Sequence, residues 1–111
     1  MNYNPRLSIY NLIILKILTE KKYESPYKMT KVISRYKGVP LTYDNIKNNI
    51  TRLQDDGFIV HCKGDGKGRS KYMKITDLGR FEYRSLLKKF EREYRFYSRI
   101  HTDFLNSETK G

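Results

Sequence analysis

The sequence predicts a mostly helical α+β fold in the order helix, helix, helix, strand, strand, helix. Apolar residues recur at three- and four-residue steps in four segments, which is typical of helices with one buried face. Two short segments with a strand-like pattern follow the third helix. Between them lies a loop, residues 63–69, that alternates glycines and charged residues. This order predicts three helices, an antiparallel hairpin and a last helix.

The composition indicates a single globular domain. A chain of 111 residues has room for one modest core, which we expect within residues 1–105, followed by a flexible polar tail over residues 106–111. Hydrophobic residues make up 38% and charged residues 32%, which excludes both a disordered chain and a membrane protein. Cys62 is the single cysteine and no signal-peptide pattern opens the chain, so we expect a cytoplasmic protein.

The charge of the chain points to a polyanionic partner. Lys and Arg number 23 against 12 Asp and Glu, giving a formal net charge of +11. So large an imbalance costs self-repulsion and favours binding to nucleic acid. The cations are spread through every segment and do not line one amphipathic helix, so an anionic membrane is the weaker candidate.

The first two helices have recognisable ends. The first is expected to begin near Asn4 or Ser8 and to end near Glu20, and its many apolar residues make it the central helix. Ser25 followed by Pro26 predicts the cap and first turn of the second helix, which should end at Gly38. Its candidate core residues are Tyr27, Met29, Val32, Ile33 and Tyr36.

The third helix is predicted over residues 42–56, between the cap Thr42 and the left-handed stop Gly57. Its buried stripe is Ile46, Ile50 and Leu53. The outward face is unusually rich in Asn and Thr, which are poor helix formers that can donate and accept hydrogen bonds at base edges. Any surface helix has a polar face, but this composition favours a helix that contacts base edges. Asn49 is counted among the polar residues of this outward face. The candidate base-reading residues are Asn45, Lys47, Asn48, Thr51 and Arg52.

The hairpin is predicted from Phe58–Cys62 and residues 70–76, with Tyr72 and Ile75 facing inward. Glycines let its tip approach a phosphate backbone or a minor groove, while the surrounding cations neutralise charge. An exposed flexible turn would have a similar composition. The candidate backbone-contacting residues are Thr42, Tyr43, Lys63, Lys67, Arg69, Ser70 and Lys71.

Catalytic and metal-binding patterns are missing from the sequence. His61 and Cys62 are neighbours on a strand, so their side chains should point to opposite faces; Cys62 is expected in the core and His61 near the base of the hairpin. No phosphate loop, catalytic triad or zinc motif occurs. We therefore expect no enzyme activity, no cofactor and no metal.

The last helix is expected over residues 77–105, with Thr76 as its cap, and is longer than the domain needs to cover its core. At ~1.5 Å per residue it would reach roughly 40 Å. Its far half could be buried by a second copy of the chain or could break near Ser98 and pack on the first helix; we favour the homodimer. The candidate interface residues are Phe90, Tyr94, Tyr97, Ile100 and Phe104.

Two runs in the sequence resemble known regulators. The run Leu53-Gln54-Asp55-Asp56-Gly57-Phe58-Ile59 and the run from Gly68 to Gly79 are similar to the winged helix-turn-helix regulators of the PadR and MarR kind. The chain also resembles small winged-helix proteins of archaeal viruses and plasmids, which would place it in a host cytoplasm. The resemblance implies a recognition helix, a wing and dimerisation through long helices. No effector-binding segment is evident.

These patterns together predict a homodimeric regulator of transcription that binds specific double-stranded DNA. The recognition helix, residues 42–56, would enter the major groove, and the wing, residues 63–71, would contact the backbone or minor groove. The alternative is an interaction module of the same fold that binds RNA or an acidic protein.

Overall fold

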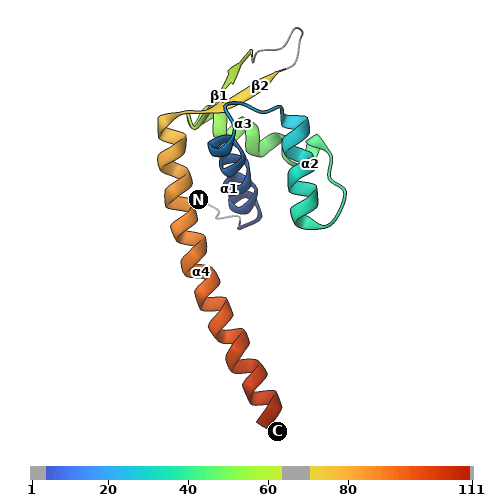
Figure 1. The fold of residues 1–111 in the computed structure, drawn as a ribbon, viewed down its shortest axis with the longest axis vertical. Coiled ribbons are helices and arrows are strands. Elements are labelled where there is room, and N and C mark those ends of the chain that lie inside the picture. Colours follow the sequence, from blue (N-terminus) through green and yellow to red (C-terminus); the bar gives the residue numbers. More distant parts are fainter. Residues whose placement is uncertain (1–4, 64–70, 111) are drawn as a thin grey trace.

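The computed structural model describes the backbone of residues 5–63 and 71–110. Its elements are α1 (Pro5–Glu20), α2 (Pro26–Lys37), a 3-10 turn η1 (Tyr43–Asn45), α3 (Lys47–Asp55), β1 (Ile59–Cys62), β2 (Tyr72–Ile75) and α4 (Asp77–Lys110). The predicted mostly helical winged-helix order is confirmed. Figure 1 shows α4 running from the hairpin past the ends of the other helices. The molecule is accordingly elongated, with extents of 64 × 29 × 27 Å.

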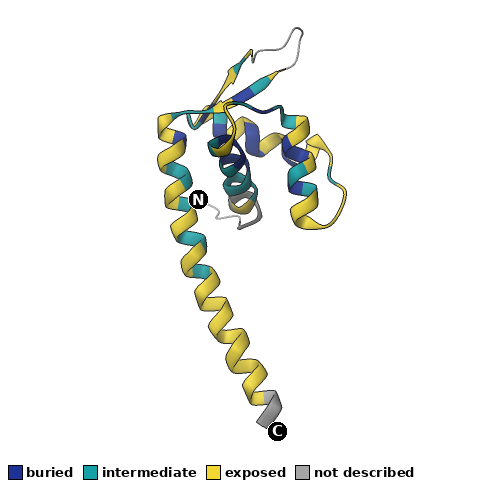
Figure 2. Cartoon of the chain, viewed as in Figure 1, coloured by how far each residue is buried: buried dark blue, intermediate teal, exposed yellow. Residues whose placement is uncertain are grey.

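The core forms around α1, as its apolar sequence predicts. Ile14, Leu15 and Leu18 are completely buried in it. Figure 2 shows buried residues gathered where α1, α2, α3 and the hairpin meet, while the far half of α4 is exposed. The remaining buried hydrophobic residues are Ile17, Met29, Ile33, Ile46, Ile50, Leu53, Ile59 and Met73. Tyr27 and Tyr36, two of the candidate core residues of α2, are exposed instead.

The predicted helix ends are confirmed at three positions. The Ser25 hydroxyl accepts a hydrogen bond from the backbone N–H of Lys28, and Pro26 occupies the first turn of α2. Gly38 ends α2 and Gly57 follows α3, with φ of +77° and +80° respectively. Residues with a side chain rarely adopt such φ angles, so glycine ends both helices with little strain.

The third helix was predicted as one continuous element, but the structure divides it into two. Its first residues form η1, and α3 begins only at Lys47. The backbone N–H of Ile46 donates to the carbonyl of Tyr43, which is the three-residue pattern of a 3-10 turn. The Thr42 end is stabilised by the Asn45 side chain, whose Oδ1 accepts from the Thr42 backbone N–H at 2.8 Å. Asn45 therefore favours the tight turn before the α-helix starts.

The hairpin corrects the predicted inward residues. In the antiparallel register Ile59 faces Ile75, His61 faces Met73 and Cys62 faces Tyr72. Met73 is buried, whereas Tyr72 lies on the other face, where its ring meets the edge of Tyr23 at a centroid distance of 4.9 Å. Because side chains alternate along a strand, Tyr72 and Ile75 cannot both face inward. Cys62 shares the Tyr72 face and is half-buried outside the core cluster, so its core assignment was wrong; His61 is exposed as expected.

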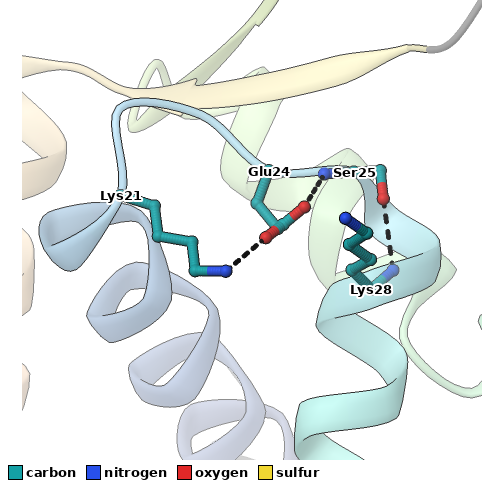
Figure 3. A network of polar contacts seen from close by, with 4 residues as sticks. All are labelled: Lys21, Glu24, Ser25 and Lys28. Atoms are coloured by element: carbon teal, nitrogen blue, oxygen red, sulfur yellow. Dashed lines mark hydrogen bonds and ion pairs between the residues drawn. The ribbon is translucent and has the colours of Figure 1, made fainter.

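A short bridge joins the α1–α2 connection to the hairpin. Backbone hydrogen bonds of 3.0 and 2.9 Å link Glu24 and Met73 in both directions. The Glu24 side chain is buried and binds Lys21 Nζ at 2.9 Å and the Ser25 backbone N–H at 2.9 Å (Figure 3). These contacts hold the start of α2 against β2, so the hairpin is attached to the helical body as well as to α3 and α4.

The start of α4 is fixed by a cap and a close contact. The Thr76 hydroxyl accepts from the Gly79 backbone N–H, as predicted for the cap residue. A Cβ at position 79 would lie 2.1 Å from the carbonyl oxygen of Phe58. Glycine is therefore required where α4 crosses the start of β1.

The end of α4 differs from the prediction. The helix continues to Lys110, although a flexible tail was expected from residue 106, and it does not break near Ser98. Neither proline nor glycine occurs between Gly79 and Gly111 to interrupt it. The fold-back alternative is therefore wrong. No helix in the described part of the chain is long and apolar enough to cross a membrane.

Candidate nucleic-acid interface

The outward face of α3 carries the candidate base-reading side chains. Lys47, Asn48, Thr51 and Arg52 are all exposed, because Ile50 and Leu53 anchor the opposite face in the core. Three of them, Asn48, Thr51 and Arg52, line one surface groove, which they share with Asp55 and Asp56. The groove thus has the Asn48 amide toward the helix start and the two carboxylates toward its end, with its one cation, Arg52, next to the carboxylates. Carboxylates repel phosphates, so a polyanion would approach the N-terminal part of α3 more easily.

The η1 turn brings further candidates to the same end of α3. Thr42, Tyr43 and Asn45 are exposed there. The Asn45 carboxamide oxygen is already engaged by the Thr42 backbone, so this residue has a structural function besides any contact with a ligand. Tyr43 is 40% exposed and offers a hydroxyl at the edge of the turn.

Asn49 does not belong to the outward face with which the sequence interpretation grouped it. It is 2% exposed, and its Nδ2 donates to Asn11 Oδ1 of α1 at 3.0 Å. The spacing could have indicated this, because Ile46, Asn49, Ile50 and Leu53 recur at the steps of a buried helix face. Asn49 therefore sets the position of α3 against α1 and leaves the outward face to its neighbours.

The hairpin brings two described cations to the base of the wing. Lys63 directly follows β1 and Lys71 directly precedes β2, and both side chains are exposed. The candidates Lys67, Arg69 and Ser70 lie outside the described residues. Because Cys62 pairs with Tyr72, Lys63 and Lys71 lie just beyond the last strand pair, at the same end of the hairpin. A positive charge therefore stands where the loop leaves the sheet.

The described residues form no group of three or more His, Cys, Asp or Glu side chains that could hold a metal ion. The candidate site thus consists of exposed donors and acceptors on α3 with exposed lysines at the hairpin. Such a surface can form hydrogen bonds and ion pairs with a ligand.

Solved structures of bacterial and archaeal regulators share this fold. A transcriptional regulator from Clostridium thermocellum aligns with a TM-score of 0.74 and 20% identity over 89% of this chain and 96% of its own. A putative transcriptional regulator from Thermoplasma acidophilum aligns with a TM-score of 0.73 and 17% identity over 84% and 90%. Bacillus subtilis PadR in complex with operator DNA aligns with a TM-score of 0.57 and 24% identity over 71% of this chain and 46% of that one.

The chain therefore has a PadR-like winged helix-turn-helix fold with a long C-terminal helix. No protein-family model matches the sequence, and no curated protein is significantly similar to it.

Proposed function

We propose that this chain is a transcriptional regulator that binds specific sequences in double-stranded DNA. The observation that carries the proposal is the division of α3 into two faces. One face is anchored by Ile50, Leu53 and the Asn49–Asn11 hydrogen bond, and the other exposes Asn48, Thr51 and Arg52. The net charge of +11 and the operator complex of the structurally similar PadR support DNA as the ligand.

In this proposal α3 enters the major groove. Arg52 can bind guanine through two hydrogen bonds, and Asn48 can bind adenine in the same way. The hydroxyl of Thr51 can form a hydrogen bond with a base edge, and its methyl group can contact the methyl group of thymine. Lys47 and Asn45 flank these three residues and complete the base-reading set. The acidic pair Asp55 and Asp56 lies at the far end of α3, which favours docking through the first two turns.

The proposed backbone contacts surround α3. Thr42 and Tyr43 lie just before it, and the wing follows it. Contacts to phosphates would position the domain without selecting a sequence. The proposed wing residues are Lys63, Lys67, Arg69, Ser70 and Lys71.

We also infer that the protein acts as a homodimer through α4. Tyr83 and Leu86 pack against the core of their own chain, and Phe90 is half-buried beyond them. The same stripe continues along α4 with Tyr94, Tyr97, Ile100 and Phe104, which are 72%, 65%, 51% and 58% exposed. A second α4 could bury them and set two α3 helices at successive major grooves.

The test compares sequence preference with affinity. Sequences bound by the wild type are first selected from a random duplex pool, and binding is then measured for selected and random duplexes across a salt series. Arg52→Ala and Asn48→Ala should reduce the preference, each by about 1–3 kcal/mol at one base position. Lys63→Ala and Lys71→Ala should weaken binding to both duplexes alike and lower the salt slope by about 1 each.

Unchanged preference in the α3 variants would contradict the assignment of base reading to α3. If the wild type binds no duplex at low salt, the proposal fails, and RNA and acidic proteins become the ligands to test.

A further inference from the structure

Contrary to the expectation that the cations line no single amphipathic helix, a row of them runs along α4, and neither the core nor the proposed site uses it. Between positions 80 and 99 the helix carries seven Lys and Arg against three Glu. Six of the cations follow one another at steps of four or three residues and are all exposed. They define the basic row of α4: Arg80, Arg84, Lys88, Arg92, Arg95 and Arg99.

The basic row lies on the side of α4 opposite the apolar stripe. At about 100° per residue its six positions occupy about a third of the helix circumference, and Tyr83, Leu86, Phe90 and Tyr97 fall on the other side. Glu82 and Glu93 also fall there, whereas Glu91 alone of the three glutamates falls within the sector of the row. Burial of the apolar stripe by α1 or by a second copy would therefore leave the row facing solvent.

Among the side chains that the structure describes, no ion pair neutralises the basic row. The ion pairs Lys16–Glu20 and Lys21–Glu24 involve none of its six members. Lys89 and Glu93, which do have partners in the described part of the chain, are outside the row. Surface cations in helices are commonly paired at i,i+4, so a long unpaired row that keeps like charges close carries an unfavourable energy. A polyanion laid along the row would remove that repulsion.

The size of the row suits a nucleic-acid duplex. From Arg80 to Arg99 the helix rises about 28 Å. A duplex presents one phosphate charge per ~1.7 Å of its axis, so an equal length offers more than enough phosphates to neutralise all six cations. Arginine, five of the six residues, binds phosphates through planar, bidentate geometry.

A duplex bound at α3 and the wing cannot cover the whole row. Figure 1 shows α4 leading away from α3 and the hairpin, and its far half extends beyond the rest of the body. A duplex at α3 and the wing would therefore lie at one end of a molecule whose longest extent is 64 Å. A ligand along the far half of α4 would be a separate segment of DNA.

We propose that the basic row of α4 binds the phosphate backbone of a second DNA segment, so that the protein joins two duplexes. This inference rests on the proposed function, because the first segment is the one held by α3 and the wing. The second contact is independent of sequence, since it involves cations and phosphates only.

The test uses the full chain and two duplexes of mixed sequence, one attached to beads and one fluorescent. Protein-dependent capture of the fluorescent duplex measures bridging, and fluorescence anisotropy with a single duplex in limiting amount measures binding at α3 and the wing. The triple variant Arg92→Gln, Arg95→Gln, Arg99→Gln removes the half of the row farthest from α3. Glutamine keeps a helix propensity close to that of arginine, so circular dichroism should be unchanged.

The wild type should capture the second duplex. The triple glutamine variant should still bind one duplex, but the amount of second duplex that it captures should fall at least about tenfold. Substitution of the same three arginines by lysine should preserve bridging, because the charge remains. A matched control, Lys22→Gln, Lys31→Gln, Arg35→Gln, removes three exposed charges outside the row and should still bridge.

Four results would overturn the inference. Bridging that survives in the glutamine variant would show that two α3–wing sites of a dimer join the duplexes. An equal loss of bridging in the matched control would show that bridging depends on the net charge of the protein and not on the basic row. Single-duplex binding by a wild type that does not bridge would remove this inference and leave the proposed function intact, whereas a wild type that binds no duplex would remove both.

Discussion

Asn49 Nδ2 in α3 donates a hydrogen bond of 3.0 Å to Asn11 Oδ1 in α1. The two residues stand 38 positions apart, and Asn49 is almost completely buried between Ile46, Ile50 and Leu53. Apolar contacts tolerate sliding of one helix on another, whereas a buried hydrogen bond has one favourable geometry. This pair therefore fixes the rotation and height of α3 against the central helix.

Asn49→Ala should destabilise the protein by about 1–3 kcal/mol, because it leaves the Asn11 carboxamide without this donor and opens space in the core. The measurement is urea unfolding of the two single variants and of the Asn11→Ala, Asn49→Ala double variant. Their double-mutant cycle should give a favourable coupling of about 0.5–1.5 kcal/mol. Asn48→Ala is the matched control on the exposed face and should change stability by less than about 0.5 kcal/mol. A coupling of zero would show that the pair does not fix α3.

Gly79→Ala should also destabilise the fold. In an exposed helix this change stabilises by about 1 kcal/mol through helix propensity. Here the new Cβ would lie 2.1 Å from Phe58 O and 2.7 Å from Ile75 Cγ1, so the start of α4 must move away from the hairpin. We expect a net loss of about 1–3 kcal/mol in thermal or urea unfolding. Ser85→Ala, on the exposed face of the same helix, should be nearly neutral. A stabilised Gly79→Ala protein would contradict the close contact.

Glu24 should make stability depend on acid pH. Burial acts to raise the pKa of its carboxyl group, but the Lys21 side chain and the Ser25 backbone N–H outweigh it and hold the pKa below the ordinary 4.5. The carboxylate therefore contributes stability that is present above pH 4.5 and is lost as the pH falls through the lowered folded-state pKa. Glu24→Gln should be less stable than the wild type at pH 7, by about 1 kcal/mol, and this difference should shrink below pH 4.5.

Urea unfolding of the wild type and Glu24→Gln from pH 7 to pH 3 measures this effect. Glu20→Gln is the matched control, because Glu20 pairs with Lys16 on the exposed surface and should change stability by less than about 0.5 kcal/mol. A difference between Glu24→Gln and the wild type that is independent of pH would exclude the ion pair as its cause.

The fold was predictable from the sequence because its signals are local. Gly38 and Gly57 end helices through their own backbone conformation. Ser25 and Thr76 cap helices through hydrogen bonds to residues three positions later, although Thr76 also contacts the hairpin. The errors occurred where distant segments decide the outcome. Met73 is buried because β2 pairs with both β1 and Glu24, and neither pairing is visible in the residues around it.

The candidate site was predictable only in part for the same reason. The outward position of Asn48, Thr51 and Arg52 follows from helix periodicity and the buried Ile50 and Leu53. Asn49 was misplaced because residue type was given more weight than spacing, and its partner Asn11 is far away in the sequence. Its polar amide could be buried only because α1 supplies a partner.

The homodimer inferred for α4 gives the last prediction. Tyr97 and Ile100 lie in the exposed half of the apolar stripe, so glutamates there should cost the isolated chain little. In a dimer the same charges would be buried without partners, which costs on the order of 3 kcal/mol, or roughly a hundredfold in the dissociation constant. Tyr97→Glu, Ile100→Glu should therefore sediment as a monomer with unchanged helix content, while the wild type sediments as a dimer.

Ser98→Glu is the matched control for this variant, since it adds a charge to the same turn on the side away from the stripe and should remain dimeric. A chain ending before Arg92 should also be monomeric, because it lacks the exposed half of the stripe. A double glutamate variant that stays dimeric would place the interface elsewhere on the molecule. A monomeric wild type would remove the dimer, and the single recognition helix would then have to select its DNA sequence from one major groove alone.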